Sequence, residues 1–128
     1  MDPKDLRFAP THEWAKLEGP TCTVGITKFA VDQLTDVVYI ELPDVGDHVF
    51  AGEDFGEIES VKSVNDLYSP CDGEVIAVNK KLEDDPTIIN KDPYGEGWMI
   101  KIKVEPGTKL DKMLSQADYE KQIASQGH

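Results

Sequence analysis

The sequence has 128 residues, enough for one domain with a modest hydrophobic core, and its 39% hydrophobic content indicates a soluble, folded protein. The 25 acidic residues outnumber the 13 Lys and Arg residues, which gives a formal net charge of −12. This balance argues against nucleic acid and anionic membrane surfaces as partners, because binding to either needs a basic patch. No apolar run approaches the roughly 20 residues of a membrane-spanning helix.

Short β-prone runs separated by Gly, Pro, Asp and Asn dominate the sequence. In chain order, we expect strands over residues 13–17, 21–26, 37–42, 55–60, 64–68, 73–78 and 98–104. The last run alternates most regularly, which is typical of a half-buried strand. Its predicted inward side chains are Trp98, Ile100, Ile102 and Val104, and its predicted outward side chains are Met99, Lys101 and Lys103.

Two segments have the spacing of helices. Thr27 is a suitable N-cap for a short helix through Leu34. Near the end of the chain, apolar residues at helical spacing predict a C-terminal helical segment over about 108–124, with a break before Tyr119. Many short strands with few helices predict a mainly β fold, a small β sandwich or barrel, in a single domain over 1–128.

The two cysteines, Cys22 and Cys71, lie far apart and lack the spacing of a redox or metal motif. We expect both to be buried free thiols, which fits a reducing compartment. The N-terminus shows no targeting segment. A bacterial cytoplasm is therefore expected, and a processed form from the mitochondrial matrix would have the same appearance.

The familiar catalytic motifs are missing. We find no GxSxG, GxxxxGK[ST], HExxH or GxGxxG pattern, and the three histidines are not spaced as metal ligands, so no metal site is expected. His12 precedes Glu13, but neighbouring residues of a strand point to opposite faces, so we do not expect an acid–base pair. His48 lies in a predicted turn and is expected at the surface. The sequence therefore predicts a protein that is not a catalyst.

One lysine stands alone in an acidic stretch, residues 55–78. Lys62 is the only basic residue there, and the stretch holds five carboxylates: Glu57, Glu59, Asp66, Asp72 and Glu74. If residues 55–60 and 64–68 pair as antiparallel strands, Lys62 lies at or beside the tip of a tight hairpin. A lysine that another enzyme modifies needs such a rigid and accessible place, but a surface lysine that keeps an edge hairpin soluble also explains the pattern.

Several motifs, in order, resemble the H-protein family of the glycine cleavage system. The run EIESVKS at 57–63, followed by SPCDGEV at 69–75, is similar to the hairpin that carries the family's lipoyl-lysine. Further matches are THEW at 11–14, TVGIT at 23–27, YIELP at 39–43 and NKDPYGEGWMIK at 90–101. The likeness covers roughly residues 8–120. It implies one lipoyl-carrier domain of the barrel-sandwich hybrid type, a flattened β barrel with a carrier hairpin at about 55–70.

The resemblance implies that lipoate is amide-linked to Lys62 by a lipoate ligase or lipoyltransferase. The arm would receive the aminomethyl group of glycine from a pyridoxal-phosphate glycine decarboxylase (P protein). It would deliver the one-carbon unit to a tetrahydrofolate-dependent aminomethyltransferase (T protein), and dihydrolipoamide dehydrogenase (L protein) would then reoxidise the dithiol. The chain itself would be a carrier and not an enzyme.

Five further residues acquire expected roles from the resemblance. Thr11, Glu13 and Asp66 would belong to a surface cleft that shelters the loaded arm, where polar acceptors could hold the cationic amine. The family usually has a smaller residue, often serine, at the position of Thr11. Glu57 and Glu59 are of the right type to be recognised by the ligase and the partner enzymes, although they would also suit a solvated strand.

Other functions stay open from sequence. A lipoyl or biotinyl carrier could serve a different multienzyme system, but the tip Val61-Lys62-Ser63 lacks the Met-Lys-Met-like pattern of biotin carriers. A homologue could act only as a donor of lipoate to other proteins. An unmodified β-domain adaptor would have no use for Lys62.

Overall fold

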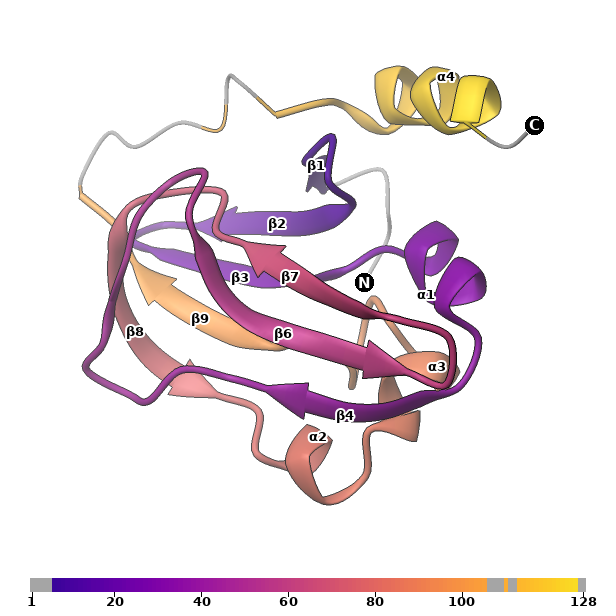
Figure 1. The fold of residues 1–128 in the computed structure, drawn as a ribbon. Helices are drawn as coiled ribbons and strands as arrows, with labels where there is room; N and C mark the ends of the chain where they lie inside the picture. Colours follow the sequence, from indigo (N-terminus) through magenta and orange to yellow (C-terminus); the bar gives the residue numbers. More distant parts are fainter. Residues whose placement is uncertain (1–5, 106–109, 111–112, 127–128) are drawn as a thin grey trace.

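The structure is a computed structural model, and it describes residues 6–105, 110 and 113–126 (Figure 1). Two antiparallel sheets form a sandwich, one with the strand order β1-β2-β3-β9-β8-β5 and one with the order β4-β6-β7. The strands are β1 (Arg7–Phe8), β2 (Glu13–Glu18), β3 (Thr21–Ile26), β4 (Val37–Glu41), β5 (His48–Val49), β6 (Asp54–Ser60), β7 (Val64–Tyr68), β8 (Gly73–Val78) and β9 (Ile100–Lys103). The helices are α1 (Lys28–Leu34), α2 (Lys81–Asp84), α3 (Thr87–Lys91) and α4 (Gln116–Gln126).

The predicted mainly β fold is confirmed, because apolar residues of both sheets face one another in one core. Alternating positions on β3 and β9, such as Val24 and Ile102, are fully buried between the sheets. Ile58 of β6 and Leu67 of β7 close the core from the three-stranded sheet. Helix α1 also begins as predicted, since the Thr27 side chain accepts a hydrogen bond from the Ala30 amide.

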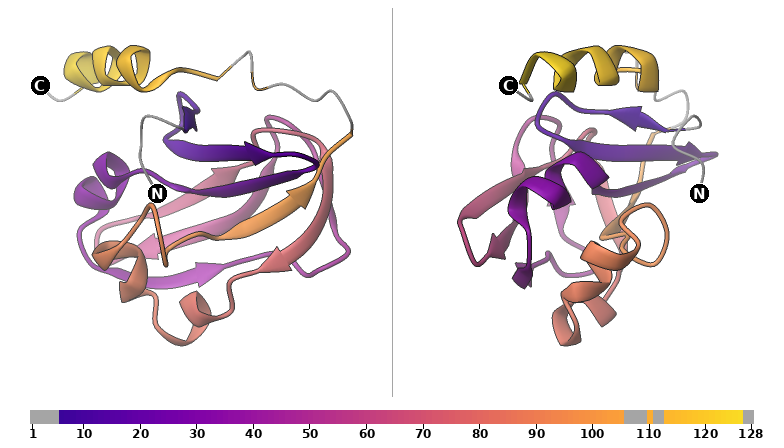
Figure 2. Two further views of the ribbon diagram at one scale, coloured as in Figure 1. Left: turned by 180° about the vertical axis from the view of Figure 1, so that it is seen from behind. Right: turned by 90° about the vertical axis from the view of Figure 1, so that its right-hand side faces the viewer.

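A second, smaller cluster lies under α4, on the side of the six-stranded sheet near β1 and β2 (Figure 2). Its buried members are Leu6, Phe8, Trp14 and Tyr119. Trp14 needs the glycine opposite it, because a Cβ on its register partner Gly25 would lie 2.5 Å from the indole ring. This second cluster attaches the C-terminal helix to the N-terminal strands.

Two sequence predictions need correction. Strand β9 begins only at Ile100, and at 98–99 the alternation is reversed: Met99 is fully buried and Trp98 is half-buried. The cause is a turn, in which the Trp98 amide donates to the Gly95 carbonyl. The Nζ atom of Lys101 then lies 5.1 Å from the centre of the Trp98 ring, in a cation–π contact.

The C-terminal helix was expected over about 108–124, and it begins instead at Gln116. Residues 108–109 and 111–112 of the expected segment lie outside the described residues. Leu114 is not helical, because it pairs with Phe8 through two backbone hydrogen bonds in an isolated antiparallel bridge. Competition from this extended pairing explains why Leu114 is not part of a helix despite its helical spacing.

The remaining observations concern single residues and short elements. Cys22 and Cys71 are buried and free, as predicted, and His48 is exposed. The shortest elements, β1, β5, α2 and α3, have between two and five residues and were not predicted from the sequence. None of the helices in the described part of the chain is long and apolar enough to cross a membrane.

Candidate functional site

Strands β6 and β7 form a tight hairpin with Lys62 in its connection. Glu59 and Val64 are the last register partners, and beyond that pair lie Ser60, the last residue of β6, and the turn residues Val61, Lys62 and Ser63. The Lys62 side chain is exposed, and no carboxylate among the described residues lies within ion-pair distance of it. An unpaired, accessible amine at a hairpin tip has the placement that modification by another enzyme requires.

The backbone of this tip is fixed, although the lysine side chain is not. The buried Ser60 hydroxyl accepts hydrogen bonds from the amide of Lys62 at 3.1 Å and from the amide of Ser63 at 3.2 Å. The Ser60 amide in turn donates to the Ser63 carbonyl at 2.9 Å. The Ser60 hydroxyl therefore satisfies the backbone amides of Lys62 and of the residue that follows it, and this holds the tip in one conformation.

A second set of contacts supports the tip from the side. The Val61 amide donates to the carbonyl of Asp36 at 3.2 Å, in the connection between α1 and β4. That connection is held by Asn90 of α3, whose amide group donates to the Thr35 carbonyl at 2.5 Å and accepts from the Val37 amide at 3.1 Å. In the sequence Asn90 is marked only as part of a motif, and its support of the hairpin follows from these three-dimensional contacts.

A cavity of about 600 Å³ adjoins the hairpin tip through Ser63. One part of its wall is the segment 10–13, a second part is α1, and a third part is β6 and β7. The apolar lining residues are Ile26, Phe29, Ala30, Leu34, Ile58 and Leu67. The polar lining residues include Thr11, His12, Glu13, Gln33, Asn65, Asp66 and Tyr68. The cavity therefore combines an apolar interior with polar groups, as is typical of ligand sites.

Glu13 is the most unusual residue of this cavity, because it is an acidic residue that is only 1% exposed. One carboxylate oxygen accepts a hydrogen bond from the Thr11 hydroxyl, and the other accepts from the Tyr68 amide at 3.1 Å. Burial raises the pKa of Glu13, and the hydrogen bonds from Thr11 and Tyr68 partly oppose that rise. No Lys or Arg among the described residues pairs with this carboxylate.

His12 departs from the sequence prediction. It was expected to point away from the face of Glu13, but both residues line the cavity. The reason is that β2 begins only at Glu13, and His12 precedes it with φ of +82°. This left-handed conformation is uncommon outside glycine. Because His12 is not part of the strand, its side chain need not point to the face opposite that of Glu13.

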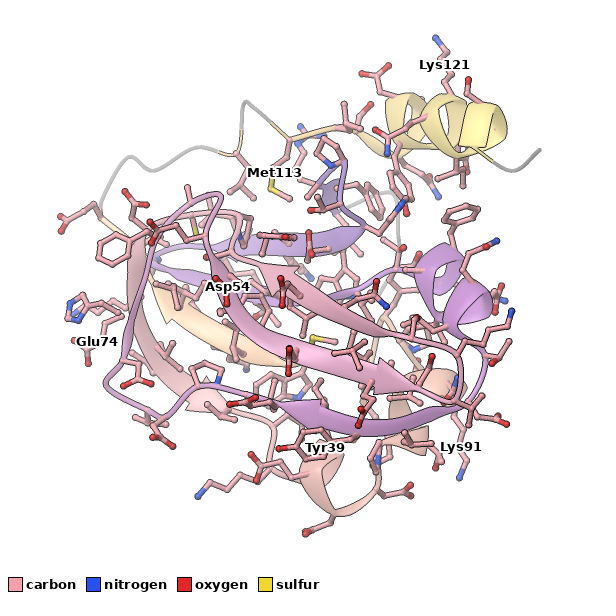
Figure 3. The ribbon with its side chains drawn as sticks, in the orientation of Figure 1. Tyr39, Asp54, Glu74, Lys91, Met113 and Lys121 are labelled. Atoms are coloured by element: carbon pink, nitrogen blue, oxygen red, sulfur yellow. The ribbon has the colours of Figure 1, made fainter. Side chains whose placement is uncertain are left out.

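The five residues with roles implied by the resemblance lie in two places, the cavity and the outer face of the hairpin. Thr11, Glu13 and Asp66 all line the cavity. Glu57 and Glu59 lie on β6, and cross-strand pairing gives Glu57 the neighbours Glu41 and Asp66, while Glu59 has Tyr39 and Val64. Figure 3 looks onto this three-stranded sheet, with Tyr39 of β4 and Asp54 of β6 labelled. Asp66 thus lies at the boundary between the cavity and the row of carboxylates.

Adjacent like charges across strands destabilise a sheet. The Glu41, Glu57 and Asp66 row has no Lys or Arg ion-pair partner among the described residues. Two exposed apolar side chains, Tyr39 and Val64, lie in the neighbouring row. The outer face near Lys62 therefore combines uncompensated negative charge with exposed apolar surface.

Comparisons with known proteins agree with this geometry. The family model described as "Glycine cleavage H-protein" matches residues 6–126. A glycine cleavage system H protein from Carboxydothermus hydrogenoformans is 48% identical over 125 residues, covering 98% of this chain and 96% of the relative. One from Symbiobacterium thermophilum is 51% identical over 118 residues, covering 92% of each chain.

A solved structure gives the same result for the fold. The crystal structure of a glycine cleavage system H protein from Mycobacterium marinum superposes with a TM-score of 0.88 at 36% identity, covering 96% of this chain and 99% of that one. Since the family model and these relatives span nearly the whole sequence, the chain belongs to the glycine cleavage H-protein family.

Proposed function

We propose that this chain is the lipoyl carrier of a glycine cleavage system and that lipoate is attached to Lys62. The observation that carries the proposal is the placement of an unpaired lysine on a rigid hairpin tip, directly beside a cavity, in a member of this family. The described residues act as one carrier domain and perform no catalysis themselves. When attached, lipoate supplies a dithiolane that accepts and releases the transferred group.

The cavity suits a lipoyl arm in size and chemistry. Its volume of about 600 Å³ lies within the usual range of roughly 300–1,000 Å³ for small-molecule sites. Phe29, Leu34 and Ile58 offer the apolar contacts that an alkyl chain needs. Ser63 lines the cavity one residue after Lys62, so an arm on that lysine begins at the mouth of the cavity.

Glu13, with Thr11 and Asp66, supplies the polar part of the arm site. A carboxylate with no Lys or Arg partner in the described part of the chain attracts an amine by a charge-assisted hydrogen bond. The Thr11 hydroxyl and the Tyr68 amide hold the Glu13 carboxylate in place without neutralising it. The threonine at position 11 keeps the hydroxyl that this role needs, as the Thr11–Glu13 contact supports.

Glu57 and Glu59 are proposed as recognition residues on the outer face of the hairpin. Their uncompensated charge is complementary to a basic surface on a partner, and such complementarity raises association rates and selects partners. The partners proposed are the P, T and L proteins of the system and a lipoate ligase or lipoyltransferase. The relatives named above are bacterial, and the cytoplasmic location stays a prediction.

Intact-mass analysis tests the attachment. Protein produced in cells that lipoylate their own carriers is expected to gain one lipoyl-sized adduct that maps to Lys62. Lys62→Arg should abolish the adduct, and the matched change Lys80→Arg, at another exposed lysine, should leave it intact. A biotin-sized adduct, or no adduct in such cells, would contradict the proposal.

A second assay separates a glycine cleavage carrier from a protein that only donates lipoate. The lipoylated chain is mixed with P protein, glycine and labelled bicarbonate, and label should enter the carboxyl group of glycine. Lys62→Arg protein should give no label above background. Absence of exchange with the lipoylated chain would leave the donor role as the better explanation.

A further inference from the structure

Tyr119 of α4 makes two hydrogen bonds, one to His12, which lines the cavity, and one to Thr27, the N-cap of α1. Its hydroxyl lies 2.8 Å from Nδ1 of His12 and 2.7 Å from the Thr27 hydroxyl. The Tyr119 ring stacks on Phe8 with centroids 4.7 Å apart, and the residue is 3% exposed. Burial raises the pKa of Tyr119 to about 12, so the phenol stays protonated and able to donate.

The two partners of this hydroxyl belong to different elements, each of which contributes a wall of the cavity. His12 lies in the segment 10–13, whose side chains line the cavity. Thr27 is the N-cap of α1, and its side-chain oxygen accepts from the Ala30 amide at 3.3 Å. Helix α1 contributes four lining residues, namely Phe29, Ala30, Gln33 and Leu34. A single phenol therefore joins two cavity walls that come from separate elements.

The hydrogen-bond directions can all be satisfied together. Because the Thr27 oxygen accepts from the helix, its own hydrogen can be donated to the phenol oxygen, and the phenol can then donate to Nδ1 of His12. A phenylalanine at position 119 would keep the stacking on Phe8 and remove both contacts. The buried Thr27 hydroxyl would then lose this acceptor, at a site where Thr27 is fully buried.

His12 shows why such a link matters. Its φ of +82° is unfavourable for a residue with a side chain, and such conformations persist only where surrounding contacts hold them. Tyr119 supplies one such contact from α4, and the His12 carbonyl accepts a second one from the Thr27 amide at 2.9 Å. A third contact holds the same segment, because the Gln122 side-chain amide of α4 donates to the Pro10 carbonyl at 2.9 Å.

We propose that Tyr119 is a positioning residue for the arm cavity. Its hydroxyl fixes the segment 10–13 against the start of α1, and α4 thereby sets how firmly the cavity retains a folded-in arm. The second half of this statement rests on the proposed function, since it requires an arm on Lys62. The first half concerns the unmodified chain and can be tested without lipoate.

Hydrogen exchange on the full-length, unmodified chain tests the link. In Tyr119→Phe, the backbone amides of His12 and Thr27 should exchange roughly five-fold or more faster than in the wild type, because both lie in segments that the phenol joins. Tyr94→Phe is the matched control, because the Tyr94 hydroxyl accepts from the Lys28 amide but does not contact the segment 10–13. Unchanged exchange at both amides in Tyr119→Phe, or an equal change in Tyr94→Phe, would overturn the proposal.

His12→Asn tests the same link from its other end and serves if Tyr119→Phe does not fold. Asparagine tolerates a positive φ but is too short to replace the imidazole contact. The Thr27 amide should again exchange faster than in the wild type, and protection equal to the wild type would overturn the proposal.

Arm retention is measured on the lipoylated chain after P protein and glycine have loaded the arm with its aminomethyl group, by the rate at which iodoacetamide alkylates the remaining free thiol of the arm. We expect Tyr119→Phe to be alkylated about three-fold or more faster than the wild type, with Tyr94→Phe unchanged. Equal rates in Tyr119→Phe and the wild type would overturn the role in retention. If the loaded wild-type arm reacts as fast as free dihydrolipoamide, the sheltering cavity of the proposed function fails. Retention by Tyr119 then fails with it, while the exchange experiment still tests the link between Tyr119 and the segment 10–13.

Discussion

Removal of the Ser60 hydroxyl should loosen the tip that carries Lys62. Ser60→Ala leaves the amides of Lys62 and Ser63 without their acceptor, and each such hydrogen bond contributes about 0.5–1.5 kcal/mol net. Because water can reach part of the tip, we expect the free energy of unfolding to fall by about 1–2 kcal/mol. With an unfolding entropy near 2.1 cal/mol/K per residue, this corresponds to a fall in Tm of about 4–7 °C.

The effect on modification should be as large in free energy as the effect on the fold. Fixing one backbone residue costs about 1–2 kcal/mol, and a ligase that meets a mobile tip must supply that free energy itself. We therefore expect kcat/KM for lipoylation of Lys62 to fall about five- to thirty-fold, measured by intact mass over time with purified ligase.

Ser63→Ala is the matched control for this experiment. It removes a hydroxyl from the other side of the lysine, where the hydroxyl accepts only from the exposed Asn65 side chain. Its loss of stability should stay below about 0.5 kcal/mol. If Ser60→Ala lipoylates no more slowly than Ser63→Ala, the idea that Ser60 preorganises the tip is refuted.

Three further changes test other parts of the site. Asn90→Ala removes the acceptor of the Val37 amide and should cost about 1–3 kcal/mol in chemical denaturation; a loss below about 0.5 kcal/mol would contradict its supporting role. Gly56→Ala places a Cβ 2.2 Å from the Glu41 carbonyl oxygen, so the pairing of β4 with β6 must shift. Thermal unfolding should show that the free energy of unfolding falls by about 1–3 kcal/mol. An unchanged Tm would show that the sheet accommodates the added methyl group without strain. The raised pKa of Glu13 means that the folded state binds its proton more tightly than the unfolded chain, so this group's contribution to stability falls as pH rises above about 4.3. In urea titrations, the free energy of unfolding of the wild type relative to Glu13→Gln should therefore decline as the pH rises above about 4.3. A difference that does not change with pH would refute the raised pKa of Glu13.

Features that depend on neighbours in sequence were predictable. The hairpin strands and the N-cap Thr27 follow from local alternation, turn residues and capping chemistry, and the structure shows them close to the expected positions. The cavity residues Thr11 and Glu13 were identified by resemblance, because no local pattern marks a glutamate as buried. Physical rules alone favour an exposed glutamate, since burial of an unpaired carboxylate is costly.

Features that depend on distant contacts were not predictable. Leu114 has helical spacing, but its pairing with Phe8 at the other end of the chain imposes an extended backbone. Met99 is buried because a turn through Gly95 shifts the start of β9. Tyr119 carried no signal of its own, since its partners His12 and Thr27 lie 107 and 92 residues away. In each case a tertiary contact outweighs local periodicity.

The separation between Tyr119 and His12 also orders events during synthesis. The strand pairs around Lys62 and the contact of its tip with Asp36 join only residues 36–68, so they can form soon after those residues leave the ribosome. The link between Tyr119 and the segment 10–13 must wait for nearly the last residues of the chain. The nascent chain can thus form the strand pairs that carry its lysine before α4 joins the segment 10–13, and a ligase can encounter the hairpin before that wall of the cavity is fixed.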